Sequence, residues 1–215
     1  MLKKGILMIM LIGLTACGKN DNFLTSDKAD ASYNQAISYY MQGDLNQAEK
    51  AFLDIIKDYP YYTPAFIMIG KTYYFKNDMK NSEKYLKESL NKNKNVTAYI
   101  WLSKIELLGN RGEKALEYLN SALSLDFSNP LTHYELGKYY RTVKKYEKAV
   151  YHLNYAISYE DIYGQMKMDL ASLYVEIGAA DKAKLLYQDI LKAGNLPQKD
   201  AEQLKKVIDL IGTNK

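Results

Sequence analysis

The pattern of hydrophobic and polar positions repeats along most of the chain. In its clearest copy, Gly137 and Tyr140 lie within one helical pattern, and Ala149, Leu153 and Ala156 follow at the spacing of a second helix. The same arrangement recurs at intervals of 33 or 34 residues, and the residues equivalent to Gly137 and Tyr140 are Ala36 and Tyr39, Gly70 and Tyr73, Ser103 and Glu106, and Ala171 and Tyr174. A fixed period of this length predicts stacked pairs of helices, because neither helix of a pair can bury its hydrophobic side alone.

Short polar segments separate the two expected helices of each unit. They lie at residues 43–44, 77–78, 109–112 and 178–180, so we place the units at 29–62, 63–95, 96–129, 130–163 and 164–197. The first unit is expected to hold helices over residues 30–42 and 45–58, and Pro60 ends the second of them. Residues 198–215 form a capping helix and tail, with Leu204, Val207, Ile208 and Ile211 on its inward side.

The period and the pattern resemble the tetratricopeptide repeat (TPR), over residues 29–197. The resemblance implies an all-α, right-handed α-solenoid of about five helix-turn-helix repeats with a C-terminal capping helix. The small residues Gly70 and Gly137 should face Ser82 and Ala149, so that the two helices approach closely. Tyr39, Tyr73 and Tyr140 should lie in the core. The third repeat departs most from the pattern, because Glu106 stands where other repeats carry Tyr.

The first residues indicate a targeting segment. Lys3 and Lys4 precede an apolar stretch at residues 6–14, which reaches roughly 14 Å and is too short to cross a membrane. Residues 14–17 (Leu-Thr-Ala-Cys) resemble a bacterial lipobox. The resemblance implies a signal peptide over residues 1–16, a lipid attached to Cys17, a flexible tether over 17–28, and a lipid-anchored place in the cell envelope. In a Gram-negative cell that place would be the outer membrane facing the periplasm. The alternative is an ordinary secretory signal with an incidental Cys.

Catalytic and metal-binding motifs are scarce. His133 and His152 have no second His or Cys at ligand spacing, so we expect neither a metal nor another cofactor. No phosphate-binding loop or nucleophile motif occurs, and we expect no enzymatic activity. The net charge of +4 does not suggest nucleic-acid binding.

The TPR resemblance also implies a partner-binding surface on the concave side, built from the first helix of each repeat. Carried onto this chain, its positions are Tyr33, Ile37, Tyr40, Ile67, Lys71, Tyr74, Ile100, Lys104, Leu107, Tyr134, Lys138, Arg141, Met168 and Ser172. Lys71, Lys104 and Lys138 lie one repeat apart and should form a positive stripe suited to an acidic or apolar segment of a protein partner. The alternative is that these lysines are ordinary exposed helix formers.

The sequence therefore predicts a membrane-anchored interaction scaffold of the bacterial cell envelope. It is similar to lipoproteins that assist pilus secretin assembly, outer-membrane barrel assembly or peptidoglycan-hydrolase regulation, and nothing in it selects one of these. The alternative is a solute-binding or enzymatic lipoprotein with a ligand cavity among the repeats. The oligomeric state is not predicted.

Overall fold

The computed structural model describes residues 20–158 and 164–213, which form helices and no strands. The helices are α1 (Asn20–Met41), α2 (Leu45–Asp58), α3 (Thr63–Phe75), α4 (Met79–Lys92), α5 (Val96–Leu108), α6 (Gly112–Leu125), α7 (Pro130–Thr142), α8 (Tyr146–Ser158), α9 (Gly164–Glu176), α10 (Ala180–Lys192) and α11 (Gln198–Thr213). They make five consecutive pairs and one last helix, which confirms the predicted fold. None of these helices is long and apolar enough to cross a bilayer.

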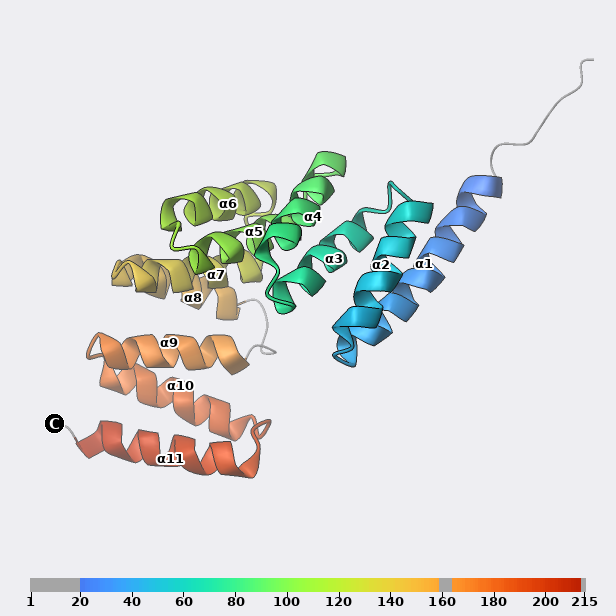
Figure 1. Ribbon diagram of the computed structural model, residues 1–215. Coiled ribbons are helices and arrows are strands. Elements are labelled where there is room, and N and C mark those ends of the chain that lie inside the picture. Colours follow the sequence, from blue (N-terminus) through green and yellow to red (C-terminus); the bar gives the residue numbers. More distant parts are fainter. Residues whose placement is uncertain (1–19, 159–163, 214–215) are drawn as a thin grey trace, which may run out of the picture.

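The helix pairs stack along an arc, with α1 and α11 at its two ends (Figure 1). The helices α1, α3, α5, α7 and α9 each pack on the even-numbered helix that follows, and each even-numbered helix packs on the next odd-numbered helix. In the middle of the array α3 also touches α5, and α5 touches α7. The odd-numbered helices therefore form one layer and the even-numbered helices the other.

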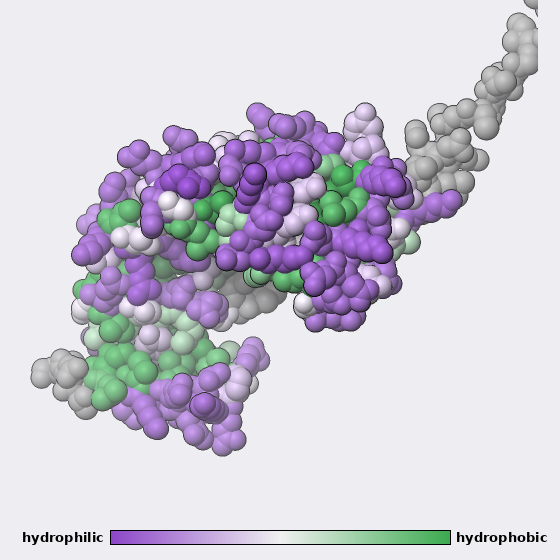
Figure 2. Space-filling view, viewed as in Figure 1, coloured by the Kyte–Doolittle hydropathy of each residue, from purple (hydrophilic) through white to green (hydrophobic). Residues whose placement is uncertain are grey.

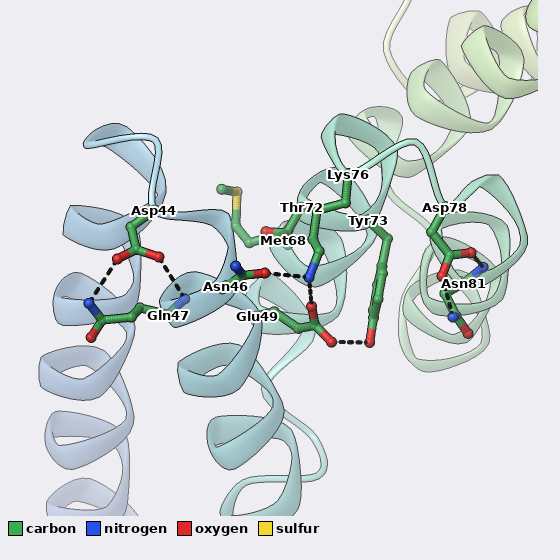
Figure 3. A network of polar contacts seen from close by, with 10 residues as sticks. All are labelled: Asp44, Asn46, Gln47, Glu49, Met68, Thr72, Tyr73, Lys76, Asp78 and Asn81. Carbon is green, nitrogen blue, oxygen red and sulfur yellow. Dashed lines mark hydrogen bonds and ion pairs between the residues drawn. The ribbon is translucent and has the colours of Figure 1, made fainter.

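A residue in the left-handed backbone conformation makes the turn within each pair. These residues have φ between 56° and 79° and are Gly43, Asn77, Asn110, Lys144 and Gly178. Glycine and asparagine tolerate this conformation best, which explains four of the five. In the first two repeats an aspartate follows and caps the next helix: Asp44 and Asp78 each accept a hydrogen bond of 3.0 Å from a backbone N–H three residues on (Figure 3).

The two helices of a pair approach closely at the small residues, as expected. The Ser82 hydroxyl donates a 2.8 Å hydrogen bond to the carbonyl oxygen of Gly70. The side chains that fill the space beside Gly70 and Gly137 are Leu86 and Leu153, which are almost fully buried. A Cβ on Gly137 would lie 2.6 Å from Leu153 Cγ, so the contact leaves no room for a side chain.

Polar contacts join the first repeat to the second (Figure 3). The Lys76 ammonium at the end of α3 donates to Asn46 Oδ1 at 2.8 Å and forms an ion pair with Glu49, both on α2. The buried Tyr73 also donates to Glu49, with 2.8 Å between Oη and Oε1. These bonds satisfy the Tyr73 hydroxyl at the edge of the core and hold α3 in register against α2.

The third repeat compensates for its unusual Glu106. This carboxylate is fully buried, and it forms ion pairs with Arg111 and, at 2.9 Å, with the Lys114 ammonium. Burial opposes ionisation of Glu106, but the two cations outweigh it and lower the pKa of the carboxyl. Both cations follow Glu106 closely in sequence, so the substitution and its compensation belong to one repeat.

The N-terminal boundary differs from the prediction. Helix α1 begins at Asn20, so the segment 20–28, which we expected to be a flexible tether, is helical. No Gly or Pro interrupts residues 20–28. Extending a helix from a packed segment costs little once its first turn exists, which explains the longer helix. Cys17 and the signal segment lie outside the described residues.

The C-terminal cap buries fewer of its predicted inward residues than expected, because Val207 lies at the surface. Leu204 and Ile208 are buried and Ile211 is partly buried, but Val207 is 39% exposed and Leu210 is 65% exposed. The described chain has no helix after α11 to cover these two side chains. Hydrophobic residues accordingly gather on the surface at the α10–α11 end of the array (Figure 2).

The fourth repeat contains a hydrogen-bonded pair of histidines, His133 and His152, whose contact was not predicted from the sequence. His133 is fully buried, and its Nε2 lies 2.8 Å from the carbonyl oxygen of Phe127. Because a carbonyl can only accept, this nitrogen donates, and His133 Nδ1 accepts from His152 Nδ1 at 3.0 Å. Tyr155 stacks on His133, and Tyr140 stacks on His152. The network requires the His133 imidazole to be neutral, with its proton on Nε2.

Tyrosine burial follows the predicted pattern only in part. Tyr73 is buried, whereas Tyr39 and Tyr140 are partly buried. In the fourth repeat the neighbouring Tyr139 is the buried one, at 8% exposed. The reason is that Tyr140 turns toward the ring of His152.

Replacing Gly137 with Ala should destabilise the fold by about 1–3 kcal/mol, because the new methyl group overlaps Leu153. Chemical denaturation followed by circular dichroism measures the change. The matched control is Gly164→Ala, since no atom lies within 4 Å of a Cβ at that position. Equal stability of the two variants would contradict the packing argument.

The histidine pair should make stability depend on pH. Burial lowers the pKa of His152 from 6.5 to about 4, and the charges of His133 and Lys148 act in the same direction. The unfolded chain therefore binds a proton that the folded chain excludes, so stability is full above pH 6.5 and falls as the pH drops toward 4. Thermal unfolding at several pH values tests this.

The control for that experiment is His152→Tyr, because Tyr85 and Tyr118 occupy the equivalent position in earlier repeats. This variant should lose the part of the slope above about pH 5 that His152 contributes, whereas His133, whose pKa burial also lowers, keeps its own part. An unchanged slope would show that another group titrates.

Candidate functional site

The predicted partner-binding residues lie along the odd-numbered helices α1, α3, α5, α7 and α9. We call the surface that they form, together with the neighbouring side chains described below, the odd-helix face. Lys138 is exposed and most of the other predicted residues are partly buried. Ile100 is the exception: it is only 6% exposed and belongs to the core, so it offers little surface to a partner. It is buried because α5 lies in the middle of the array, between α3 and α7.

Four aromatic rings form a continuous cluster over α1, α3 and α5. Phe75 lies 6.1 Å from Tyr40, 5.6 Å from Tyr74 and 5.6 Å from Trp101, measured between ring centroids. Tyr74 and Trp101 also meet edge to face at 5.0 Å. Phe75 is 55% exposed, so this aromatic cluster presents apolar area to solvent at the N-terminal half of the odd-helix face.

The Lys71 side chain lies within this cluster. Its ammonium is 5.4 Å from the centroids of both Tyr40 and Trp101, at cation–π distance. Burial lowers the pKa of Lys71, and the charge of Lys104 lowers it further. Within the described part of the chain, no carboxylate forms an ion pair with Lys71. The aromatic cluster therefore surrounds a half-buried cation that has no counterion among the described side chains.

The other two lysines of the expected positive stripe share one carboxylate partner, Glu135. Lys104 Nζ lies 2.9 Å from Glu135 Oε1, and Lys138 Nζ lies 3.2 Å from Glu135 Oε2. Glu135 is only 3% exposed, and a buried carboxylate is stable only when cations or donors compensate it. The predicted stripe of three free charges is thus interrupted after Lys71.

The C-terminal half of the odd-helix face also satisfies its own polar groups. Arg141 donates from Nε to Glu176 at 2.7 Å and from Nη2 to the Ser172 hydroxyl at 3.0 Å. Tyr134 donates to Asp169 at 2.5 Å; burial and this carboxylate raise the pKa of its hydroxyl. A partner would have to break these bonds to use the same groups, whereas the aromatic cluster needs no such exchange.

Sequence reasoning missed several residues of this face, namely Phe75, Trp101, Glu135, Asp169 and Glu176. The first four each directly follow a predicted position on the same helix, and Glu176 lies one turn after Ser172. At 100° per residue, two neighbouring positions can share one face when the surface is wide. A wider helical sector, rather than a few fixed positions, would have identified them.

An open pocket of about 580 Å³ lies near the C-terminal end, between α9, α10 and α11. Its lining includes Met168, Ile190, Leu204 and Val207 among polar residues. It bears on the alternative hypothesis of a ligand cavity, but it holds no converging group of catalytic side chains. In residues 20–158 and 164–213 no three His, Cys, Asp or Glu side chains are grouped so as to hold a metal ion.

Comparisons with known proteins agree with this architecture. Tetratricopeptide repeat families match residues 30–60 and 63–94. Comparison with curated protein sequences finds no match.

Solved structures with a similar fold include PilW, a widely conserved type IV pilus biogenesis factor (15% identity, TM-score 0.74, 86% of each chain covered). TTC0263 of Thermus thermophilus, a thermophilic TPR protein, is 19% identical with a TM-score of 0.68, over 85% of this chain and 98% of that one. YrrB, a TPR protein with an unusual peptide-binding site, is 15% identical with a TM-score of 0.56, over 88% and 98%. With its helix pairs, its period and these matches, the chain has the fold of tetratricopeptide repeat proteins, and its first two repeats match the family's sequence pattern.

Proposed function

We propose that the chain is a membrane-anchored interaction scaffold that binds a segment of a partner protein on the odd-helix face. The observation that carries this proposal is the aromatic cluster of Tyr40, Tyr74, Phe75 and Trp101. Aromatic side chains supply large contact areas at low entropic cost and dominate the energetics of protein interfaces. YrrB, which has a similar fold, carries a peptide-binding site.

We propose that the partner segment binds mainly on α1, α3 and α5. There the exposed Phe75, Met41 and Leu108 end three successive odd-numbered helices and extend the apolar area around the cluster. On α7 and α9 the charged groups pair with one another. An extended or helical segment crossing α1 to α5 would bury apolar surface without displacing an ion pair, which favours this half.

The anchor is proposed from the sequence alone. Cys17 follows an apolar segment in a lipobox-like context, and its thiol can carry a thioether-linked lipid. Asn20, the first residue of α1, comes only three residues later, so lipidation would hold the repeats close to the membrane surface of the cell envelope. In a Gram-negative cell this surface would be the periplasmic side of the outer membrane.

Site-specific photocrosslinking in the producing cell tests the binding face. A photoreactive phenylalanine analogue at Phe75 should capture a partner, and the same analogue at Tyr151 on α8 should not. The two positions are matched, since Phe75 is 55% and Tyr151 is 56% exposed. With the captured partner purified, Trp101→Ala should weaken binding by about 2 kcal/mol, as expected for an anchor residue. Capture from Tyr151 alone would place the interface on the even-numbered helices instead.

Replacing Cys17 with Ser should abolish lipidation. Metabolic labelling with an alkyne fatty acid should mark the wild type only, and the variant should move from the detergent phase to the aqueous phase on partitioning. The control restores a thiol elsewhere, as Cys17→Ser with Ser26→Cys, and should remain unlabelled. A wild-type chain without an acyl group would refute the anchor and leave the binding face unaffected.

A further inference from the structure

We propose that Lys71 is a recognition site for one side-chain carboxylate, an Asp or Glu flanked by apolar residues in the partner segment. This rests on the proposed function, and it adds the chemistry that the odd-helix face selects. The site consists of the Lys71 ammonium and the rings of Tyr40 and Trp101 beside it, with Phe75 at its rim.

The charge balance of the face singles out Lys71. Lys104 and Lys138 share Glu135, and Arg141 pairs with Glu176, so each of these cations has a carboxylate partner. Among the side chains that the structure describes, Lys71 contacts the faces of two aromatic rings at 5.4 Å and no carboxylate. Aromatic rings compensate a half-buried ammonium only in part, since a cation–π contact is weaker than a charge-assisted hydrogen bond.

The neighbouring charge strengthens the argument. Lys104 is close enough to Lys71 for the two ammonium groups to repel one another. Glu135 offsets the charge of Lys104 but is shared with Lys138, so the group of three lysines and one carboxylate keeps a net charge of +2. One incoming carboxylate would give Lys71 a counterion and reduce this repulsion.

The apolar side chains around Lys71 determine which residues should flank the carboxylate in the partner segment. Tyr40 and Trp101 both lie 5.4 Å from the Lys71 ammonium, and Phe75 contacts both of these rings, so residues next to the acidic one would lie against rings. A phosphate group is bound well by the planar guanidinium of an arginine, whereas this site supplies a single lysine ammonium. A singly charged carboxylate between apolar neighbours is the better complement.

A carboxylate inside the partner chain fits better than one at its C-terminus. Lys71 lies on α3, with α1 on one side and α5 on the other, and the aromatic cluster continues over all three helices. A bound segment can therefore pass across Lys71 and contact rings on both sides.

Peptide selection tests this inference without knowledge of the natural partner. The full chain is the bait for random peptides displayed with blocked C-termini, and a second library leaves the C-termini free. The tightest peptide of the blocked library is synthesised with its acidic residue intact and with that residue changed to Gln or Asn. Wild-type protein should bind the acidic version about tenfold more tightly, as expected for a charge-assisted hydrogen bond.

The variant Lys71→Met should bind both versions equally, and Lys71→Arg should keep the acid preference. The matched control is Lys87→Met on α4, which removes a surface lysine paired with Glu83 and should behave as wild type. Circular dichroism establishes that each variant is folded. If Lys71→Met does not fold, Lys71→Gln takes its place.

The outcomes separate this inference from the proposed function. An acid preference that survives Lys71→Met, or binders from the free C-terminal library alone, would overturn the carboxylate site. If Trp101→Ala still weakens binding in that case, the interaction face stands. Peptides that bind regardless of Trp101 and Phe75, or a selection that yields no binders, would count against the face itself as well.

Discussion

The close contact between the two helices of each repeat is the constraint on which the array depends. Leu86 lies against Gly70 and Leu153 against Gly137, at distances that exclude any side chain on the glycine. This contact fixes the separation within a pair, and the next pair must then stack on the surface that the first one presents. The odd-numbered helices consequently form one continuous layer, which brings side chains 33 or 34 residues apart in sequence onto one surface.

The repeat period made most of the fold predictable. The turns at Asp44 and Asp78 could be located because glycine, asparagine and aspartate have local conformational preferences that act within a few residues. The start of α1 could not, because whether a polar segment extends a helix depends on the packing of the part that follows. The exposure of Val207 depends likewise on what lies beyond the last helix, and the pattern within α11 does not contain that information.

The candidate site was predictable only as a surface. The period placed Tyr40, Lys71 and Tyr74 on the same side, and the structure brings them together. The spacing of Glu135 and Lys138 on one helix permits their pairing, but it could not show that Glu135 would also bind Lys104, because that pairing depends on the distance between α5 and α7. The same limit applies to His133 and His152: they are 19 residues apart, on two helices, and their hydrogen bond follows from helix packing rather than from spacing.

Equivalent positions in successive repeats therefore differ in the charge that is available to bind a partner. Lys71, Lys104 and Lys138 occupy one position in three successive repeats, yet only Lys71 lacks a carboxylate in the described structure. The difference arises at the position that the following repeat brings against each lysine, which is Trp101 for Lys71 and Glu135 for Lys104. Glu135 gives Lys104 a carboxylate partner, whereas Trp101 gives Lys71 an aromatic face and adds apolar area beside it. The backbone repeat fixes where the lysines lie, and a single adjacent residue determines whether their charge is available for binding.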